Sequence, residues 1–318
     1  MQGVFNLKLV SYKLRGKPGT YRIGCVIDQN VIDLQEGYRA FLLSKKEKDA
    51  ARHVHHQLPS DPTAFYQCGT SGLGRAREAY HYVTSQADKE SLMFDLEDVS
   101  FGMPISQPEK IICVGKNYAE HVAEMRDGDI PKFPVLFAKF SNALVGPEDA
   151  IEKAPATQKL DYEAELAIVI GKEASQVSQE DAYDYIAGYT IANDISARDL
   201  QKRTPQWLQG KTLDRSTPVG PWIVTADEID NPCNLSIRSF VNGEKRQDSN
   251  TSHFIFDIPF LMEFITDLIT LKPGDIILTG TPDGVGFAMD PPQFLDEGDT
   301  VTLEIEEIGK LENRVICK

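Results

Sequence analysis

Short apolar runs follow one another along the chain beyond residue 105, and most of them are too short to be helices. Val, Ile, Leu and Thr are frequent in these runs, and Gly, Pro, Asn or Asp flank them, which is typical of strands. The predicted strands are Ile111–Gly115, Val135–Lys139, Glu163–Ile170, Gly188–Asn193, Pro221–Thr225, Leu235–Asn242, Asp275–Thr279, Val301–Glu306 and Arg314–Cys317. One long helix is predicted over Asp257–Leu271, before the stop signal Lys272-Pro273-Gly274. Many strands and few helices predict an α+β, mainly β fold.

The first hundred residues indicate a small accessory unit of mixed α+β structure. Phe5–Leu14 and Tyr21–Ile27 have strand character, and Gly74–Thr84 is a predicted helix. The stretch 59–74 is rich in Pro, Gly, Ser and Thr and is predicted to be loop. Pro104 and Pro108 bracket a short polar link. We therefore predict a small N-terminal accessory domain over residues 1–104 and a larger catalytic domain over residues 105–318.

The composition narrows the possible classes of protein. The chain has 318 residues, with 48 acidic and 33 basic side chains and a formal net charge of −15. A nucleic-acid binder needs a basic surface, so this charge argues against one. No apolar run is long enough to span a membrane, and the N-terminus has no signal-peptide pattern, so we expect no membrane partner. Five scattered cysteines without a C-x-x-C pair are typical of a reducing compartment, and we expect a cytoplasmic location.

Acidic residues stand at the ends of two predicted strands. Alternation of side chains along a strand would place Asp161, Glu163 and Glu165 on one face, before the run becomes wholly apolar. The next apolar strand ends at Asp194. Like charges at the mouth of a buried strand are costly unless they are paired or bind a cation. An exposed edge strand that carries acids against aggregation is the alternative. The sharper prediction is a three-carboxylate site of Glu163, Glu165 and Asp194 for Mg²⁺, Mn²⁺ or Ca²⁺.

A histidine and a glutamate share one face of a short predicted helix after the strand Ile111–Gly115. His121 and Glu124 are three residues apart, so their side chains are neighbours. A carboxylate beside an imidazole fixes its tautomer and raises its basicity, which suits a general base. A simple surface pair is the alternative. The polar stretch Arg126–Pro134 could form a mobile lid over a substrate.

A glycine-rich turn follows the strand Asp275–Thr279. Its backbone amides and the hydroxyl of Thr281 could bind a carboxylate in the manner of an anion nest, although a plain turn explains the glycines equally well. The turn lacks the G-K-[ST] ending of a P-loop, and no helix pattern follows it as in a dinucleotide fingerprint. The sequence therefore excludes these two phosphate-binding motifs here.

Five motifs, in this order, resemble the fumarylacetoacetate hydrolase family. They are Gly115-Lys116-Asn117-Tyr118-x-x-His121-x-x-Glu124, Leu160-Asp161-Tyr162-Glu163-x-Glu165, Asn193-Asp194-x-x-x-Arg198-Asp199-x-Gln201, Gly210-Lys211-x-x-Asp214, and Thr279-Gly280-Thr281-Pro282-x-Gly284-Val285-Gly286. The resemblance covers residues 105–318 and is weaker over the first hundred. It is strongest to bacterial members and to second-mitochondrial-type members, which carry an extra N-terminal domain.

The resemblance implies a mixed β-sandwich roll, usually a homodimer, with Mg²⁺ or Mn²⁺ held by Glu163, Glu165 and Asp194; Ca²⁺ is possible in crystals. The catalytic residues implied by the family are His121, Glu124 and Lys211. The substrate-binding residues so implied are Asn117, Tyr118, Arg198, Gln201 and Thr281.

The function expected from these residues is cleavage of a C–C bond in a small 2-oxo acid through a metal-stabilised enolate. Hydrolysis of an acylpyruvate or fumarylacetoacetate-type substrate and decarboxylation of oxaloacetate both fit. An isomerase or decarboxylase of the 2-hydroxyhepta-2,4-diene-1,7-dioate type is an alternative. A metal-bound interaction protein with incidental activity is another, although such a protein would not need a general base.

Overall fold

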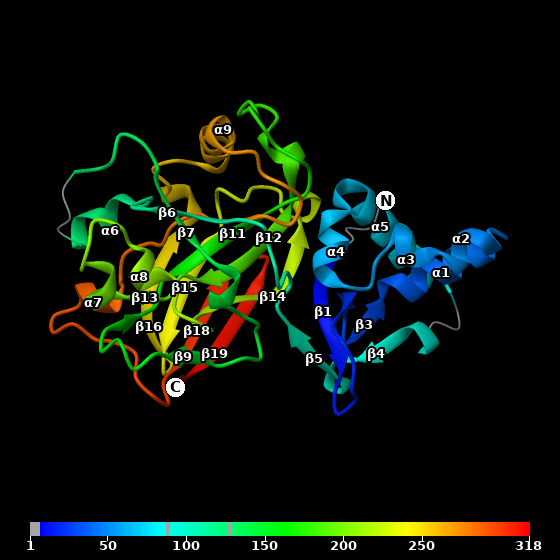
Figure 1. Cartoon of the computed structure of the whole chain (residues 1–318), viewed down its shortest axis with the longest axis horizontal. Helices are drawn as coiled ribbons and strands as arrows, with labels where there is room; N and C mark the ends of the chain where they lie inside the picture. The colour runs from blue at the N-terminus through cyan, green and yellow to red at the C-terminus, as the bar shows by residue number, and fades with distance from the viewer. Residues whose placement is uncertain (1–6, 87–89, 126–128) are drawn as a thin grey trace.

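The computed structural model describes residues 7–86, 90–125 and 129–318, and it has two lobes joined through one large sheet (Figure 1). The large sheet has twelve strands, with the main order β4-β3-β2-β1-β14-β12-β11-β17-β6-β7. A second sheet of five strands has the order β16-β15-β18-β19-β9. The predicted α+β, mainly β fold is confirmed.

The N-terminal lobe packs helices against the first strands of the large sheet. Its elements are β1 (Lys8–Leu14), β2 (Arg22–Ile27), β3 (Asn30–Asp33), α1 (Leu34–Ser44), α2 (Lys48–Arg52), α3 (Val54–Gln57), α4 (Pro62–Gln67), α5 (Gly69–Ser85), β4 (Met93–Asp95) and β5 (Val99–Gly102). The two predicted strands are confirmed within the described residues. The loop predicted over 59–74 is wrong, because Asp61 caps α4 by accepting a hydrogen bond from the Ala64 N–H, and α5 already begins at Gly69.

The C-terminal lobe contains the remaining elements. They are β6 (Ile111–Gly115), α6 (Ala119–Glu124), β7 (Val135–Lys139), β8 (Leu144–Val145), β9 (Ile151–Lys153), β10 (Leu160–Asp161), β11 (Ala164–Ile170), β12 (Ile186–Asn193), β13 (Ser196–Ala197), α7 (Arg198–Gln201), α8 (Leu208–Lys211), β14 (Thr217–Thr225), β15 (Ser236–Val241), β16 (Glu244–Asn250), α9 (Ile258–Leu268), β17 (Ile276–Leu278), β18 (Thr300–Ile305) and β19 (Gly309–Cys317). The predicted strands and the long helix are all present, with ends that differ by a few residues.

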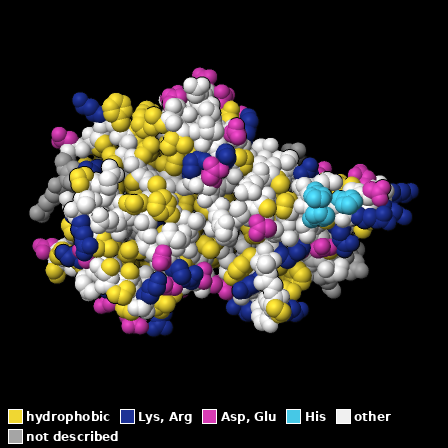
Figure 2. Space-filling model, in the orientation of Figure 1, with side chains coloured by type: hydrophobic (Ala, Val, Ile, Leu, Met, Phe, Trp, Pro, Cys, Tyr) yellow, Lys and Arg dark blue, Asp and Glu magenta, His cyan; other side chains and the backbone are white. Residues whose placement is uncertain are grey.

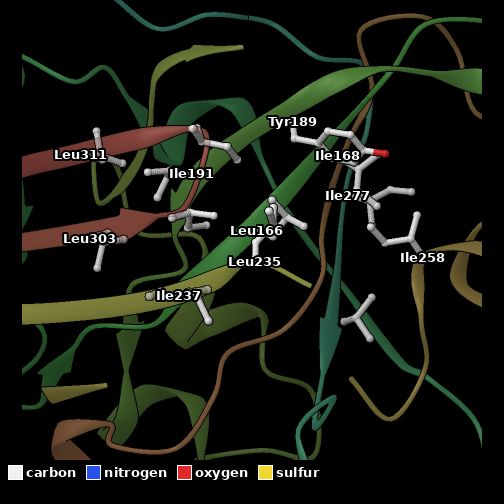
Figure 3. Close-up of a cluster of buried hydrophobic side chains, with 14 of the residues drawn as sticks. Leu166, Ile168, Tyr189, Ile191, Leu235, Ile237, Ile258, Ile277, Leu303 and Leu311 are labelled. Atoms are coloured by element: carbon white, nitrogen blue, oxygen red, sulfur yellow. The ribbon is translucent and has the colours of Figure 1, made fainter. Parts of the chain in front are cut away.

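The core of this lobe lies between the two sheets. Figure 3 shows Leu166 and Ile191 of the large sheet facing side chains of the small sheet and its flanks, all of them almost fully buried: Leu235, Ile237, Leu303 and Leu311. Burial of such side chains is the main favourable term in folding. The sandwich therefore holds β11 and β12 rigidly at the point where their polar ends emerge.

The large sheet continues across the boundary predicted near residue 105. Lys8 and Leu9 of β1 pair with Val224 and Ile223 of β14. A single cluster of buried side chains also takes members from both lobes, such as Leu9 and Ala167. The division into domains 1–104 and 105–318 remains a prediction, and the two lobes share both a sheet and a core.

The surface of the N-terminal lobe carries a group of histidines, and the lengths of the helices bear on the expectation of no membrane partner. Figure 2 shows a group of histidines on the surface of the N-terminal lobe, inward of its charged tip. His53 lies between α2 and α3, and His55 and His56 lie within α3. Among the described residues they do not complete a metal-binding group. No described helix is both long and apolar enough to cross a membrane.

Candidate active site

The pairing of β11 with β12 brings three carboxylates together. The two strands are antiparallel with Ala164 opposite Asn193, so Glu163 and Glu165 lie beside Asp194. The Asp194 N–H donates to the Glu163 carbonyl at 2.9 Å, and the Glu163 N–H donates to Asn193 Oδ1 at 3.0 Å. Glu163, Glu165 and Asp194 each offer an oxygen within 4.8 Å of the others. Buried carboxylate oxygens at this spacing suit a hard divalent cation.

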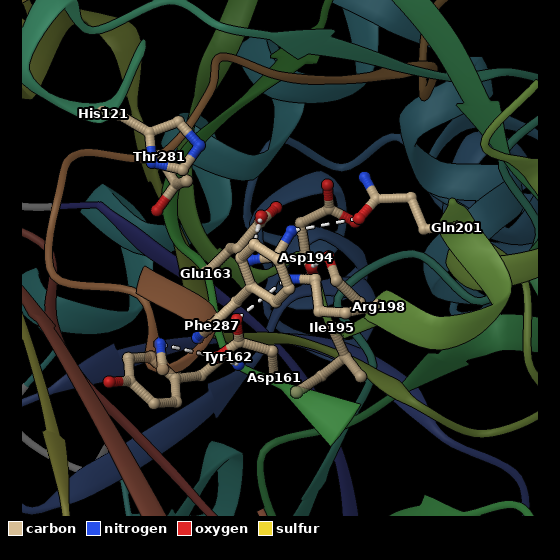
Figure 4. A network of polar contacts seen from close by, with 12 residues as sticks. His121, Asp161, Tyr162, Glu163, Asp194, Ile195, Arg198, Gln201, Thr281 and Phe287 are labelled. Carbon is tan, nitrogen blue, oxygen red and sulfur yellow. Dashed lines mark hydrogen bonds and ion pairs between the residues drawn. The ribbon is translucent and has the colours of Figure 1, made fainter. Parts of the chain in front are cut away.

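Asp161 does not join this cluster, contrary to the prediction that it shares a face with Glu163 and Glu165. The strand breaks after β10, because Tyr162 and Glu163 lie outside both β10 and β11. Asp161 instead accepts hydrogen bonds from the Gly286 and Phe287 N–H groups at 2.8 and 3.0 Å, and pairs with Arg198 Nε at 2.8 Å (Figure 4). The break therefore turns its carboxylate toward the glycine-rich turn.

Three buried cations surround the cluster. Lys211 Nζ lies 2.6 Å from both Glu163 Oε2 and Asp194 Oδ2. Lys139, at the end of β7, donates to Asp194 Oδ1 at 2.7 Å and to the Ile195 carbonyl at 3.1 Å. Arg198 forms an ion pair with Glu163 Oε1 at 2.8 Å. Every oxygen of Glu163 and Asp194 thus has a cationic partner.

Glu165 differs from the other two acids. Among the described side chains and backbone groups, its hydrogen-bond donor is the Gly280 N–H, at 2.8 Å from Oε2. Burial, then repulsion from Asp194 and Glu163, raises the pKa of Glu165 well above its usual range. Burial also opposes ionisation of Glu163, but Lys211 and Arg198 outweigh it and lower its pKa. The carboxylate without a cation is therefore the one that would gain most from a bound metal ion.

The predicted pair of His121 and Glu124, called the dyad below, forms at the wall of the same cavity. His121 Nδ1 and Glu124 Oε1 are 2.7 Å apart, and Glu124 Oε2 accepts the Gly284 N–H at 2.8 Å. Because Glu124 is an acceptor in both contacts, the arrangement favours the His121 tautomer with hydrogen on Nδ1. Nε2 then keeps its lone pair, as a general base requires.

The cavity has a volume of about 270 Å³. The three acids, His121 and Lys211 line it, with Val114, Val122, Met125, Phe137, Pro205 and Trp207 as its apolar wall. Gly115 leaves the space for Trp207, because a Cβ there would lie 2.5 Å from the Trp207 ring. The Lys211 ammonium lies 4.9 Å from the centre of the Phe137 ring.

Two neutral side chains face this cavity as hydrogen-bond donors. Gln201 Oε1 accepts from Arg198 Nη1 at 3.2 Å, which leaves the Gln201 amide nitrogen for a ligand. Thr281 Oγ1 accepts from Gln247 Nε2 at 2.7 Å, so its own hydrogen remains to be donated. Donors beside a cation site suit an anionic ligand.

The comparisons with known proteins identify the family. Residues 110–316 match the family model described as fumarylacetoacetate (FAA) hydrolase C-terminal. The chain belongs to the fumarylacetoacetate hydrolase family. The resemblance inferred from the five motifs is thereby confirmed.

Relatives in this family span nearly the whole chain. The mitochondrial oxaloacetate tautomerase fahd2 of Xenopus laevis is 40% identical over 98% of this chain and 91% of its own length. The oxaloacetate tautomerase YisK of Bacillus subtilis is 40% identical over 92% of this chain and 95% of its own. A structure of maleylpyruvate hydrolase from Sphingobium sp. SYK-6 with manganese(II) and pyruvate has a TM-score of 0.72 at 28% identity, covering 98% of this chain and 99% of that chain.

The structure places Asn117 and Tyr118 of the family's first motif outside the lining of the cavity, and their substrate-binding role remains a prediction. Asn117 is fully buried and donates to the Phe256 and Thr279 carbonyls at 3.0 and 2.8 Å, so it ties the loop after β6 to its neighbours. Tyr118 packs edge-on against Phe254. Within the described residues neither lines the cavity, whereas Lys116, with a φ of 59°, does. A left-handed residue at a cavity wall is typical of a functional position.

Arg198 lines the cavity as predicted, but its guanidinium is committed to Asp161, Glu163 and Gln201. It therefore orients these three side chains. Lys139 and Gln247 were absent from the sequence-based set. Lys139 could have been found as a charged residue that ends an apolar strand, whereas Gln247 carries no comparable signal.

The predicted lid lies partly outside the described residues, which exclude 126–128. Of the remainder, Phe133 is 67% exposed and stacks on Phe264 of α9 with ring centres 6.3 Å apart. The lid remains a prediction.

Proposed function

We propose that this protein is a divalent-metal-dependent enzyme of small 2-oxo acids, and that its reaction on oxaloacetate interconverts the keto and enol forms. The observation that carries the proposal is one cavity lined by both the acid cluster and His121, whose Nδ1 contacts Glu124. Two relatives that span most of the chain are named oxaloacetate tautomerases. Mg²⁺ and Mn²⁺ both suit the three carboxylates, and manganese is present in a similar structure.

The side chains of the cavity have distinct tasks in this reaction. An ion held by Glu163, Glu165 and Asp194 would supply Lewis acidity to the substrate oxygens. His121 Nε2 takes the proton from C3 of the keto form, and Glu124 stabilises the resulting imidazolium. The C3–H electron pair becomes the C2–C3 double bond, and the carbonyl π electrons move to the oxygen. The oxygen is then protonated by the His121 imidazolium, directly or through water, which regenerates the neutral base. Lys211, Gln201 and Thr281 would hold the anionic substrate.

Cleavage of a C–C bond is the second candidate. The maleylpyruvate hydrolase structure holds pyruvate, the type of product that such cleavage releases. In this reaction His121 would activate water toward the acyl carbon, with the enolate of pyruvate as leaving group, or the enolate of pyruvate would form from oxaloacetate by loss of CO₂. Hydrolysis and decarboxylation of 2-oxo acids, and isomerisation of a 2-hydroxydienedioate, therefore remain alternatives at the same site.

The dyad argues against a pure interaction protein, because binding alone does not need an oriented imidazole. The homodimer implied by the family and the cytoplasmic location expected from the composition remain predictions.

The deciding experiment starts from enol-oxaloacetate with the Mn²⁺-loaded protein. Appearance of the keto form is followed by malate dehydrogenase and NADH, and pyruvate in the same sample is measured with lactate dehydrogenase. Accelerated keto formation without pyruvate supports tautomerisation, and pyruvate formation at the same rate favours cleavage. Full activity in EDTA, or in the Glu165→Gln variant, would refute a metal-dependent reaction.

A further inference from the structure

Gln247 is the fully buried residue of β16, a strand whose other residues are exposed or half-buried. The pairing of β15 with β16 slips beside it, since Ser239 pairs with Gln247 while Phe240 pairs with Lys245. Arg246 is therefore the extra residue of a β-bulge. Bulges redirect side chains and are frequent beside active sites. Next to this bulge, the Gln247 side chain points into the C-terminal lobe.

All hydrogen-bonding groups of the Gln247 amide are engaged, and their directions are fixed. Oε1 accepts the Ala164 N–H at 3.0 Å, between the two glutamates of the acid cluster. Nε2 donates to the Pro282 carbonyl at 2.8 Å and to Thr281 Oγ1 at 2.7 Å. A backbone N–H can only donate and a carbonyl can only accept, so the amide cannot be flipped.

This fixed amide determines the direction of the Thr281 hydroxyl. An amide nitrogen cannot accept a hydrogen bond, so Thr281 Oγ1 must be the acceptor in that contact. Its own hydrogen then needs an acceptor elsewhere, and Thr281 lines the cavity beside the acid cluster. The neighbouring Gly280 N–H donates to Glu165, which places Thr281 next to a candidate metal ligand.

We propose that Gln247 is a positioning residue that makes Thr281 a hydrogen-bond donor toward the carboxylate of the bound 2-oxo acid. The inference rests on the proposed function, because it needs an anionic substrate in this cavity. Gln247 does not touch the substrate in this scheme but acts through Thr281. Because Thr281 then donates, the site favours a ligand with an anionic oxygen beside Thr281 over a ligand with a hydrogen-bond donor there.

Binding of pyruvate to the Mn²⁺-loaded full-length protein, measured by calorimetry, tests the inference. Thr281→Val should weaken pyruvate about 10-fold or more, as expected for a lost hydrogen bond to a charged group, and Thr281→Ser should restore binding to within about 3-fold. Gln247→Glu keeps the acceptor for Ala164 but replaces the donor to Thr281, so it should weaken pyruvate to a similar extent. In the Thr281→Val background, Gln247→Glu should add less than about 2-fold.

If Gln247 had a purely structural role, the binding measurements would give different results. Full additivity of the two substitutions, or unchanged pyruvate binding in Thr281→Val, would overturn the inference. So would a fall in Mn²⁺ affinity in Gln247→Glu as large as the fall in pyruvate affinity, because Gln247 would then support the acid cluster. If the buried glutamate prevents folding, Gln247→Met gives the same comparison without the charge.

The behaviour of the wild-type protein distinguishes failure of this inference from failure of the proposed function. A wild type that converts oxaloacetate while Thr281→Val is unaffected would overturn this inference alone. A wild type that binds Mn²⁺ but neither pyruvate nor oxaloacetate would overturn both.

Discussion

Replacing Lys211 with methionine removes a buried cation from the centre of the acid cluster. The side chain of Lys211 is 2% exposed, and its ammonium contacts Glu163 and Asp194 at 2.6 Å each. Removing one partner of a buried ion pair costs at most about 3–5 kcal/mol; here Glu163 keeps Arg198 and Asp194 keeps Lys139, but one oxygen of each buried carboxylate loses its cation. For a chain of 318 residues, that loss corresponds to a fall of about 4–7 °C in Tm.

A bound divalent ion should reverse much of this loss. The ion and the Lys211 ammonium are alternative counter-charges for the same two carboxylates, so metal should stabilise Lys211→Met more than it stabilises the wild type. Thermal unfolding of both proteins in EDTA and in excess Mn²⁺ measures the two increments. We expect the increment to be larger in the variant by several degrees, and turnover of 2-oxo acids to be lost.

Lys153→Met is the matched control, because Lys153 is also a buried lysine but pairs with Asp296 and the Leu295 carbonyl outside the cavity. It should lower Tm without changing the Mn²⁺ increment. An equal increment in the wild type and Lys211→Met would refute the reasoning, since it would mean that metal and ammonium do not share the carboxylates.

Three further predictions concern other parts of the molecule. Mn²⁺ affinity, measured by calorimetry, should still rise with pH above the range in which an ordinary glutamate titrates, because burial and its acidic neighbours raise the pKa of Glu165 and the metal must displace that proton; a flat profile there would contradict this. Asp33→Ala should lower the free energy of unfolding in urea by about 2–4 kcal/mol, since Asp33 caps α1 and accepts the Tyr12 hydroxyl at 2.6 Å. Gly115→Ala should displace Trp207, which would shift the tryptophan fluorescence spectrum, and should raise the KM for oxaloacetate. An unchanged spectrum would contradict the close packing of Trp207 on Gly115.

The acid cluster could be predicted because its signal is local. The acids stand at the end of apolar runs, and adjacent antiparallel strands bring such ends together. Alternation alone misplaced Asp161, since a break in the strand at Tyr162 and Glu163 turns it toward the glycine-rich turn. Only the pairing of β10 with β13 reveals that break.

Part of α5 was predicted, over Gly74–Thr84, but the helix α1 was missed, for a different reason. The helix α1 has a readable start, because Asp33 caps it and Glu36 follows three residues later. Its apolar pattern is interrupted by Gly37, which lowers any helix score. Gly37 is buried against Val83 of α5, where a Cβ would lie 3.0 Å from a methyl group. Close packing of two helices thus explains a residue that local propensity disfavours.

Gln247 was missed because no local pattern reveals it. It lies in a polar strand, and only the bulge and the approach of the Ala164 and Pro282 backbones and of the Thr281 hydroxyl give it a role. Positions of this kind depend on contacts between segments far apart in the chain. They become visible when each buried polar atom is followed to its partner.

The charges of the site suggest why metal and substrate binding are coupled. Counted over the described side chains, the acid cluster and the neighbouring Asp161 supply four carboxylates, and Lys139, Arg198 and Lys211 supply three cations. With all seven groups ionised, they carry one net negative charge together and repel an anionic acid. A divalent ion changes the sign, and in a buried site such a change acts strongly on a neighbouring anion. The affinity for 2-oxo acids should therefore depend on metal even for contacts made only by Thr281 and Gln201.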